Sequence, residues 1–102
     1  EKLSGISIDY DNDWFGNAWF GDFYSSNEQN WQYHTKLGWI YSLSANQSGF
    51  WFWRENFGWV WTNNITFPHA YSDSYSDWLF FDFDKNQTKL FNFKLSSWSL
   101  LD

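Results

Sequence analysis

The side chains that could act as nucleophile, base and acid gather in one polar segment. His69, Ser72 and Asp73 lie close together in the sequence and supply the three groups that a serine hydrolase uses. No Gly-x-Ser-x-Gly motif, which marks the nucleophile of the α/β-hydrolases, accompanies them. A segment this rich in Ser and Asp produces such a trio by chance. We interpret the second histidine, His34, as a strand cap or as a packing partner of Trp39.

Carboxylates offer a second kind of chemistry. Glycoside hydrolysis needs two carboxyl groups about 5–10 Å apart, one of them in an apolar setting. Asp82 and Asp84 alternate along a predicted strand, and Glu55 falls in a predicted hairpin loop. We interpret all three as exposed charges that keep an aromatic-rich chain in solution. The sequence therefore predicts that the protein is not an enzyme.

A third group of residues could bind calcium. Asp9, Asp11 and Asp13 place oxygen ligands at alternate positions, as the EF-hand loop does. That loop requires Gly at its sixth position and Glu at its twelfth, where this sequence has Trp14 and Phe20. Calcium at these three aspartates is a possible cofactor, the alternative is a solvated acidic arm, and no other cofactor is expected.

Composition limits the class of protein. The chain has 102 residues, which is the length of a single domain, and aromatic residues make up 27% of it. A net charge of −6 opposes binding to the phosphates of nucleic acid. No apolar run approaches the ~20 residues of a membrane span, and no signal peptide is evident. Cys is absent, so large aromatic side chains must supply the stability that disulfides give other small domains.

Strands dominate the secondary structure that the sequence predicts. The apolar runs are short, rich in aromatic and β-branched residues, and bounded by Gly, Asn, Asp and Ser. Hairpin-length loops separate several of them, and Pro68 falls in a longer loop. The expected strands span residues 6–10, 19–24, 31–34, 39–43, 50–54, 59–62, 78–83 and 89–95.

An internal repeat organises these strands. The segment at 37–41, Leu-Gly-Trp-Ile-Tyr, returns at 57–61 as Phe-Gly-Trp-Val-Trp, and residues 18–24 with 30–34 resemble a degenerate earlier copy. A unit of about 20 residues is one hairpin, which must stack on its neighbours to bury a face. The sequence thus predicts an all-β, antiparallel meander of such hairpins, forming a small sandwich or roll. Residues 1–102 form the single domain, with 1–13 a possible flexible or strand-donating arm.

The ordered series of motifs resembles an aromatic-rich Gly-Trp repeat module at the C-terminal ends of large secreted proteins of marine bacteria, Verrucomicrobia and their relatives. That resemblance implies an extracellular or cell-surface module and implies no catalytic residues. The acidic start at 7–13 has no counterpart in the pattern. The motifs that carry the resemblance lie at residues 21–24, 31–34, 37–41, 51–53, 58–62, 67–71, 78–81 and 90–93, followed by Trp98. A composition low in Lys and rich in Ser, Asn and Tyr, with glycosylation triplets at Asn46, Asn64 and Asn86, also favours secretion.

More aromatic residues are present than a core of this size needs. Phe50 to Trp53 and Trp59 to Trp61 are large and apolar at every position, whereas a strand with one wet face alternates with polar residues. The surplus predicts a non-catalytic structural or adhesion module that acts through aromatic surfaces and self-assembles, as a homo-oligomer or as filaments. The alternative is a carbohydrate-binding module that stacks sugar rings on exposed Trp. The candidate ligand or interface residues are Trp39, Trp51, Trp53, Trp59, Trp61 and Trp78.

Overall fold

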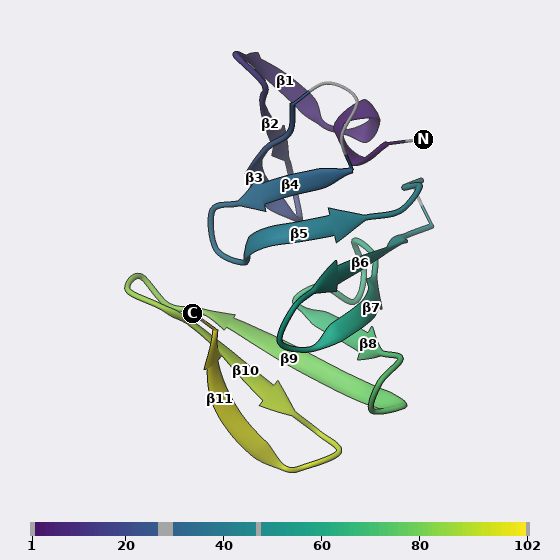
Figure 1. Ribbon diagram of the computed structural model, residues 1–102, viewed down its shortest axis with the longest axis vertical. Helices are drawn as coiled ribbons and strands as arrows, with labels where there is room; N and C mark the ends of the chain where they lie inside the picture. The colour runs from purple at the N-terminus through teal and green to yellow at the C-terminus, as the bar shows by residue number, and fades with distance from the viewer. Residues whose placement is uncertain (1, 27–29, 47, 102) are drawn as a thin grey trace.

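The fold is a single antiparallel meander, seen in a computed structural model that describes residues 2–26, 30–46 and 48–101. Each strand pairs with its neighbours in the chain, in the order β1 to β11 (Figure 1). A 3₁₀ helix, η1 (Leu3–Ile6), precedes the sheet. No helix in these segments is long and apolar enough to cross a membrane. The strands are β1 (Ile8–Asp11), β2 (Trp14–Asn17), β3 (Gly21–Tyr24), β4 (Trp31–His34), β5 (Gly38–Ser42), β6 (Phe50–Arg54), β7 (Gly58–Thr62), β8 (His69–Ser72), β9 (Asp77–Phe83), β10 (Thr88–Asn92) and β11 (Ser97–Leu101).

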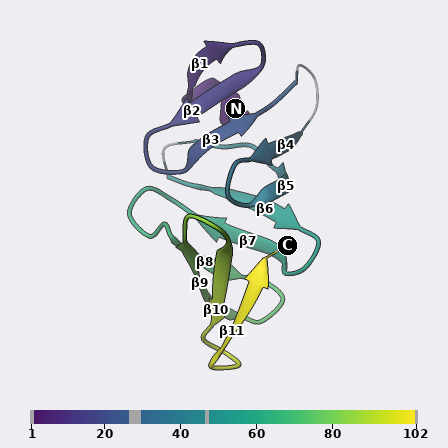
Figure 2. The same ribbon diagram turned by 90° about the vertical axis from the view of Figure 1, so that its left-hand side faces the viewer.

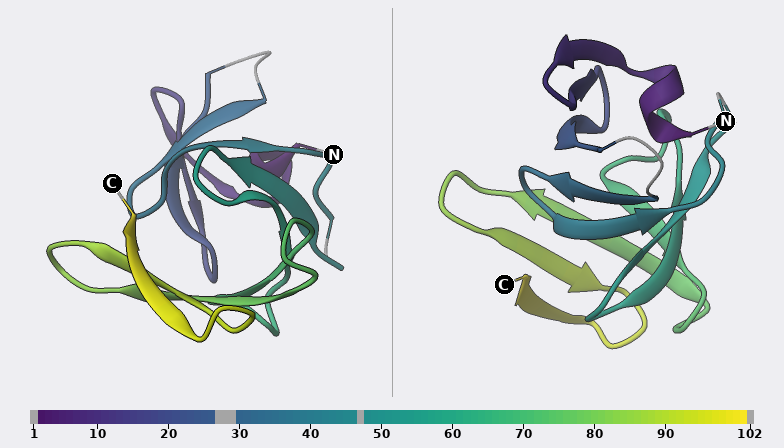
Figure 3. Two further views of the ribbon diagram at one scale, coloured as in Figure 1. Left: turned by 60° about the horizontal axis from the view of Figure 1, so that its bottom comes forward. Right: turned by 45° about the horizontal axis from the view of Figure 1, so that its top comes forward.

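The sheet curls around its own core, as a roll does. Figure 3 shows the strands β6 to β11 bending back toward β4 and β5. The Thr88 hydroxyl donates to the carbonyl oxygen of Lys36 at 2.7 Å, and the rings of His34 and Phe83 lie 6.4 Å apart. These contacts join the end of β9 and the start of β10 to the end of β4 and the turn after it. In the part of the chain that the structure describes, β1 and β11 remain the two unpaired edges of the sheet.

The predicted all-β meander is confirmed, but three strands were not anticipated. Strands β2, β8 and β11 fall outside the predicted ranges. In β8, the residues after Pro68 were assigned to a loop, yet His69 to Ser72 pair with β9, and Tyr71 and Ser72 also pair with β7. The prediction was wrong there because β8 places Ser72 in the interior, where its side chain forms a hydrogen bond instead of an apolar contact. In β11, the alternating Ser97 and Ser99 gave no hydrophobic signal.

The hairpin repeat extends further than the sequence indicated. Strands β2, β4, β6, β8 and β10 all end in a related turn, in which two residues lead to an apolar side chain and then to a residue of positive φ. Three of these turns carry the predicted Gly and two carry Ser. The residues of positive φ are Gly21 (106°), Gly38 (75°), Gly58 (79°), Ser76 (52°) and Ser96 (52°). The chain therefore contains five hairpins of one design.

The side chain that ends the first strand of each hairpin shapes the turn. Four of these side chains accept hydrogen bonds from backbone N–H groups two or three residues further along the chain. The accepting atom is Oδ1 in Asn17 and Asn92, Oγ in Ser72 and Nδ1 in His34. Arg54 uses its backbone carbonyl, to which the Phe57 N–H donates at 3.1 Å. Such bonds satisfy turn amides that the sheet ladder does not reach.

The two turns that carry Ser test whether the last turn residue has positive φ. A non-glycine residue in the left-handed region costs about 1 kcal/mol relative to Gly. We expect Ser76→Gly to raise the free energy of unfolding by about 0.5–1 kcal/mol in urea titrations. Ser74, two positions earlier, is not among the residues of positive φ, so Ser74→Gly should lower stability slightly. A loss of stability in Ser76→Gly would contradict the turn geometry.

Phenylalanine predominates in the core on the inner face of the sheet, and most of the tryptophans lie on the outer face. The core contains six buried Phe rings and no Trp, although the chain has ten Trp, all in segments that the structure describes. Along β6, for instance, Phe50 and Phe52 point inward while Trp51 and Trp53 point outward. Phe has no polar atom to satisfy in a dry core, whereas the indole N–H needs a partner. Among the described residues, no buried side-chain polar atom lacks a hydrogen bond.

Candidate functional site: an aromatic cleft on the outer face

Aromatic rings line the outer face of the sheet from β2 to β11. Successive strands place them opposite one another, as in the pairs Trp51 with Trp61, and Trp61 with Tyr71. We call this surface the outer aromatic face. Its members are Trp14, Tyr24, Trp31, Tyr33, Trp39, Tyr41, Trp51, Trp53, Trp59, Trp61, Tyr71, Trp78, Phe80, Phe91 and Trp98.

One part of the outer aromatic face is hollowed into a cleft of about 500 Å³, on strands β4, β5 and β6. This size lies in the range of about 300–1,000 Å³ typical of small-molecule sites. The aromatic cleft is lined by Trp31, Tyr33, Gly38, Trp39, Trp53, Arg54 and Glu55. Trp39 is the most exposed ring of the cleft, at 56%.

Edge-to-face packing holds the rings of the cleft in place. The centroids of Tyr33 and Trp39 are 5.3 Å apart at an interplanar angle of 71°, and those of Trp31 and Trp53 are 5.9 Å apart at 86°. Trp31 also meets Tyr41 edge-on at 5.2 Å. Each such contact contributes about 0.5–1.5 kcal/mol beyond burial. The cleft therefore presents pre-formed ring faces and needs little ordering when a ligand arrives.

Two charged residues border the aromatic surfaces. The Arg54 Nε donates to the carbonyl oxygen of Leu37 at 2.5 Å, and its Nη1 donates to Asn56 Oδ1 at 2.7 Å. These bonds fix the guanidinium between the turns after β4 and β6. Gly38 lies beneath it, since a Cβ there would come within 3.6 Å of Arg54 Nη2. Glu55 is exposed, so its carboxylate can accept hydrogen bonds from a ligand.

The six Trp residues that the sequence singled out lie on one face, but only two of them line the cleft. Trp39 and Trp53 do so, while Trp51, Trp59, Trp61 and Trp78 lie half-buried further along the outer aromatic face. Trp31, Tyr33 and Arg54 also line the cleft, and the sequence did not predict them as site residues. Their signal was the strand register, which sets Tyr33 opposite Trp39 and Trp31 opposite Tyr41.

The catalytic trio drawn from the sequence does not assemble. Ser72 is fully buried, and its Oγ accepts the Tyr75 N–H at 3.1 Å. His69, three residues earlier on β8, points to the opposite face, where its ring lies 4.9 Å from Phe80. The acidic residues considered for glycoside hydrolysis, Asp82, Asp84 and Glu55, are all exposed.

The aspartates considered for calcium form a local turn. Asp9 Oδ1 accepts the Asp11 N–H at 2.8 Å, and Asp11, Asn12 and Asp13 all have positive φ. Within residues 2–26, 30–46 and 48–101, no three His, Asp or Glu side chains lie close enough to hold a metal ion. Calcium binding by Asp9, Asp11 and Asp13 stays a prediction. Residues 8–11 of the predicted N-terminal arm pair with β2 of the same chain.

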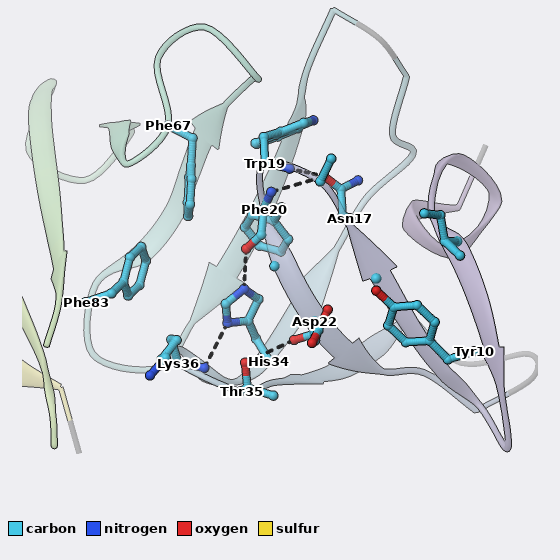
Figure 4. Close-up of a pocket in the computed structure, with 14 residues that line it drawn as sticks. Tyr10, Asn17, Trp19, Phe20, Asp22, His34, Thr35, Lys36, Phe67 and Phe83 are labelled. Atoms are coloured by element: carbon cyan, nitrogen blue, oxygen red, sulfur yellow. Dashed lines mark hydrogen bonds between the residues drawn. The ribbon is translucent and has the colours of Figure 1, made fainter. Parts of the chain in front are cut away.

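A second cavity, of about 560 Å³, lies between the N-terminal hairpins and the loop that carries Phe67 (Figure 4). His34 lines it but has no free nitrogen. Nε2 donates to the carbonyl oxygen of Phe20 at 2.6 Å, and Nδ1 accepts the N–H groups of Lys36 and Leu37 at 3.0 and 3.1 Å. Burial lowers the pKa of His34 to about 4. Of its two predicted roles, His34 thus has that of a cap at the end of β4. Because the nitrogens of His34 are already hydrogen-bonded, the aromatic cleft is a better candidate site than this second cavity.

No family model, no curated protein and no solved structure matches this chain.

Proposed function

We propose that this chain is a non-catalytic adhesion module, at the cell surface or outside the cell, that binds carbohydrate in the aromatic cleft. The observation that carries the proposal is Trp39, a large apolar ring left 56% exposed beside Tyr33, Trp31 and Trp53 in a cleft with charged borders. Monomeric proteins rarely leave clustered apolar rings in water without a use for them.

The chemistry of a sugar ring fits the surfaces of the cleft. A pyranose has a flat face of C–H groups and a rim of hydroxyls, so it needs an aromatic face and polar groups at its edge. The ring of Trp39 offers the face, and the exposed carboxylate of Glu55 offers acceptors for hydroxyl groups. Because the edge-to-face contacts pre-form the cleft, binding needs little side-chain ordering.

A glycan array followed by fluorescence titration tests the proposal. We expect one class of polysaccharide to bind and to change the Trp emission. Trp39→Ala should weaken that binding at least ~30-fold, because truncating a central aromatic anchor costs about 2 kcal/mol or more. Glu55→Gln should weaken it less, since it keeps one acceptor oxygen.

Trp78→Ala is the matched control, since Trp78 belongs to the same face but lies outside the cleft. It should bind the polysaccharide within about two-fold of the unchanged chain, as residues outside the central contacts do. Equal losses in the Trp39 and Trp78 variants would move the site away from the cleft. If no glycan on a broad array bound the chain, carbohydrate would be rejected as the ligand.

A further inference from the structure

The five hairpins of the sheet meet at four junctions, and one junction differs from the other three. At each junction, the second strand of one hairpin lies beside the first strand of the next. Three junctions end in the same hydrogen bond, which the first residue of the later turn donates to the strand before it. The bonds run from the Thr35 N–H to the Asp22 carbonyl at 3.1 Å, from Asp73 to Trp59 at 3.0 Å and from Phe93 to Trp78 at 3.1 Å.

The junction between β5 and β6 lacks this bond. It lies in the middle of the meander, between β4 and β7 (Figure 2). The equivalent groups are the Glu55 N–H and the Trp39 carbonyl, and neither has a hydrogen-bond partner among the described residues. The Trp39 carbonyl points away from β4, because the Ser42 N–H donates to Asn30 on that side and ladder bonds alternate along a strand. A backbone donor and a backbone acceptor therefore stay open across this junction.

The open junction forms one end of the aromatic cleft. Trp39 and Glu55 both line the cleft, as does Arg54, whose side chain spans the junction through its bond to the turn after β4. Trp39 is 56% exposed, whereas Trp59 and Trp78, which hold the same position in two closed junctions, are half-buried. The most exposed ring of the cleft and the open backbone groups thus lie at the same place.

We propose that the open junction binds one hydroxyl group of a neutral sugar, which accepts from the Glu55 N–H and donates to the Trp39 carbonyl. This inference rests on the proposed function and names the class of carbohydrate. A hydroxyl donates and accepts at once, whereas a carboxylate or sulfate group only accepts. An anionic group here would leave the Trp39 carbonyl unpaired and would lie beside the exposed Glu55 carboxylate. Arg54 and Glu55 together give the border of the cleft no net charge, which also favours a neutral ligand.

Amide hydrogen exchange, measured by nuclear magnetic resonance, tests the open junction with controls inside the chain. In the free chain, the Glu55 amide should be protected at least ~10-fold less than those of Thr35, Asp73 and Phe93, because a hydrogen bond must break before exchange. When the chain is saturated with a neutral polysaccharide that binds on the array, protection of the Glu55 amide should rise at least ~10-fold, while the three controls change less than about two-fold. Equal protection in the free chain, or no rise on binding, would overturn the proposal.

The variant Glu55→Pro removes the N–H itself. Residue 55 is the second residue of a turn closed by the bond from the Phe57 N–H to the Arg54 carbonyl, a position that Pro favours. The variant should therefore fold, as circular dichroism would verify. Glu55→Ala is the matched control, since it also lacks the carboxylate but keeps the N–H. Glu55→Pro should bind the neutral polysaccharide about five-fold more weakly than Glu55→Ala, the effect of one hydrogen bond, and equal affinities would count against the proposal.

The glycan array separates this inference from carbohydrate binding itself. It should carry neutral polysaccharides beside their sulfated forms, such as dextran beside dextran sulfate. We expect the neutral form of the bound polysaccharide to bind more tightly, by at least ~10-fold, or about 1.4 kcal/mol. If sulfated or carboxylated glycans alone bound the cleft, the proposed function would stand and the neutral-sugar assignment would fall. If no glycan bound, both would fall.

Discussion

Replacing Phe20 with Ala should cost about 3–5 kcal/mol of unfolding free energy, the range for Phe deletions in a packed core. Phe20 is 2% exposed and lies at the centre of the aromatic interior. Its ring centroid is 4.6 Å from that of His34, 5.1 Å from Phe50 and 5.2 Å from Phe67. Removing the ring leaves a cavity where the turn after β2 packs against β4 and β6. Urea unfolding and a melting temperature lower by about 20 °C would report it.

The repeat provides the control for this experiment. Leu95 occupies the equivalent turn position in the last hairpin but is 57% exposed. Leu95→Ala should change stability by no more than about 0.5 kcal/mol, as surface substitutions do. If the Phe20 and Leu95 variants differed by less than 1 kcal/mol, the interior would not be organised around the turn aromatics.

Acid should destabilise this fold through His34. In the folded chain, burial holds the pKa of His34 near 4, whereas an unfolded chain takes up the proton near pH 6.5. Between these values the unfolded state binds more protons, so stability falls as the pH falls from about 6.5 toward 4. Complete protonation of the unfolded state would remove about 3 kcal/mol. Above pH 6.5 both states are neutral at His34, and this residue adds no further slope.

The variant His34→Asn isolates that effect. Asn17 already caps the equivalent turn of the first hairpin through Oδ1, so Asn at position 34 can accept the same amides without titrating. The variant should be less stable overall, because it loses the bond from Nε2 to Phe20. Its stability should nevertheless depend less on pH between 4 and 6.5 than that of the unchanged chain, in urea titrations across this range. Parallel pH profiles would contradict a neutral, buried His34.

The fold was accessible from the sequence because the hairpin signal is local. Gly before Trp at positions 38 and 58 marks two turns, and the aromatic runs beside them mark strands. The sequence did not predict the two turns in which Ser76 and Ser96 have positive φ, because Gly is the usual signal for that backbone conformation. Hydrogen-bonded polar residues in the interior, such as Ser72, hid a further strand.

The site was only partly accessible, for a different reason. The alternation of Phe and Trp in residues 50–53 contains the inside and outside pattern, but both residues are apolar, so hydrophobicity alone does not separate the faces. Trp39 and Trp53 could be selected as exposed candidates. Their meeting with Trp31 and Tyr33 depends on the pairing of β4 with β5 and of β5 with β6, and that register is a property of the folded sheet.

The most direct test of carbohydrate binding in the aromatic cleft is a titration followed by nuclear magnetic resonance. The titrant is the polysaccharide that binds on the glycan array, and the signals are those of the indole N–H groups of the ten Trp residues. The cleft contains three of these residues, Trp31, Trp39 and Trp53. Their signals should shift together and saturate with one affinity, while those of Trp19, Trp78 and Trp98 stay in place. Shifts confined to Trp outside the cleft, or no shift with any polysaccharide, would contradict a carbohydrate site in the aromatic cleft.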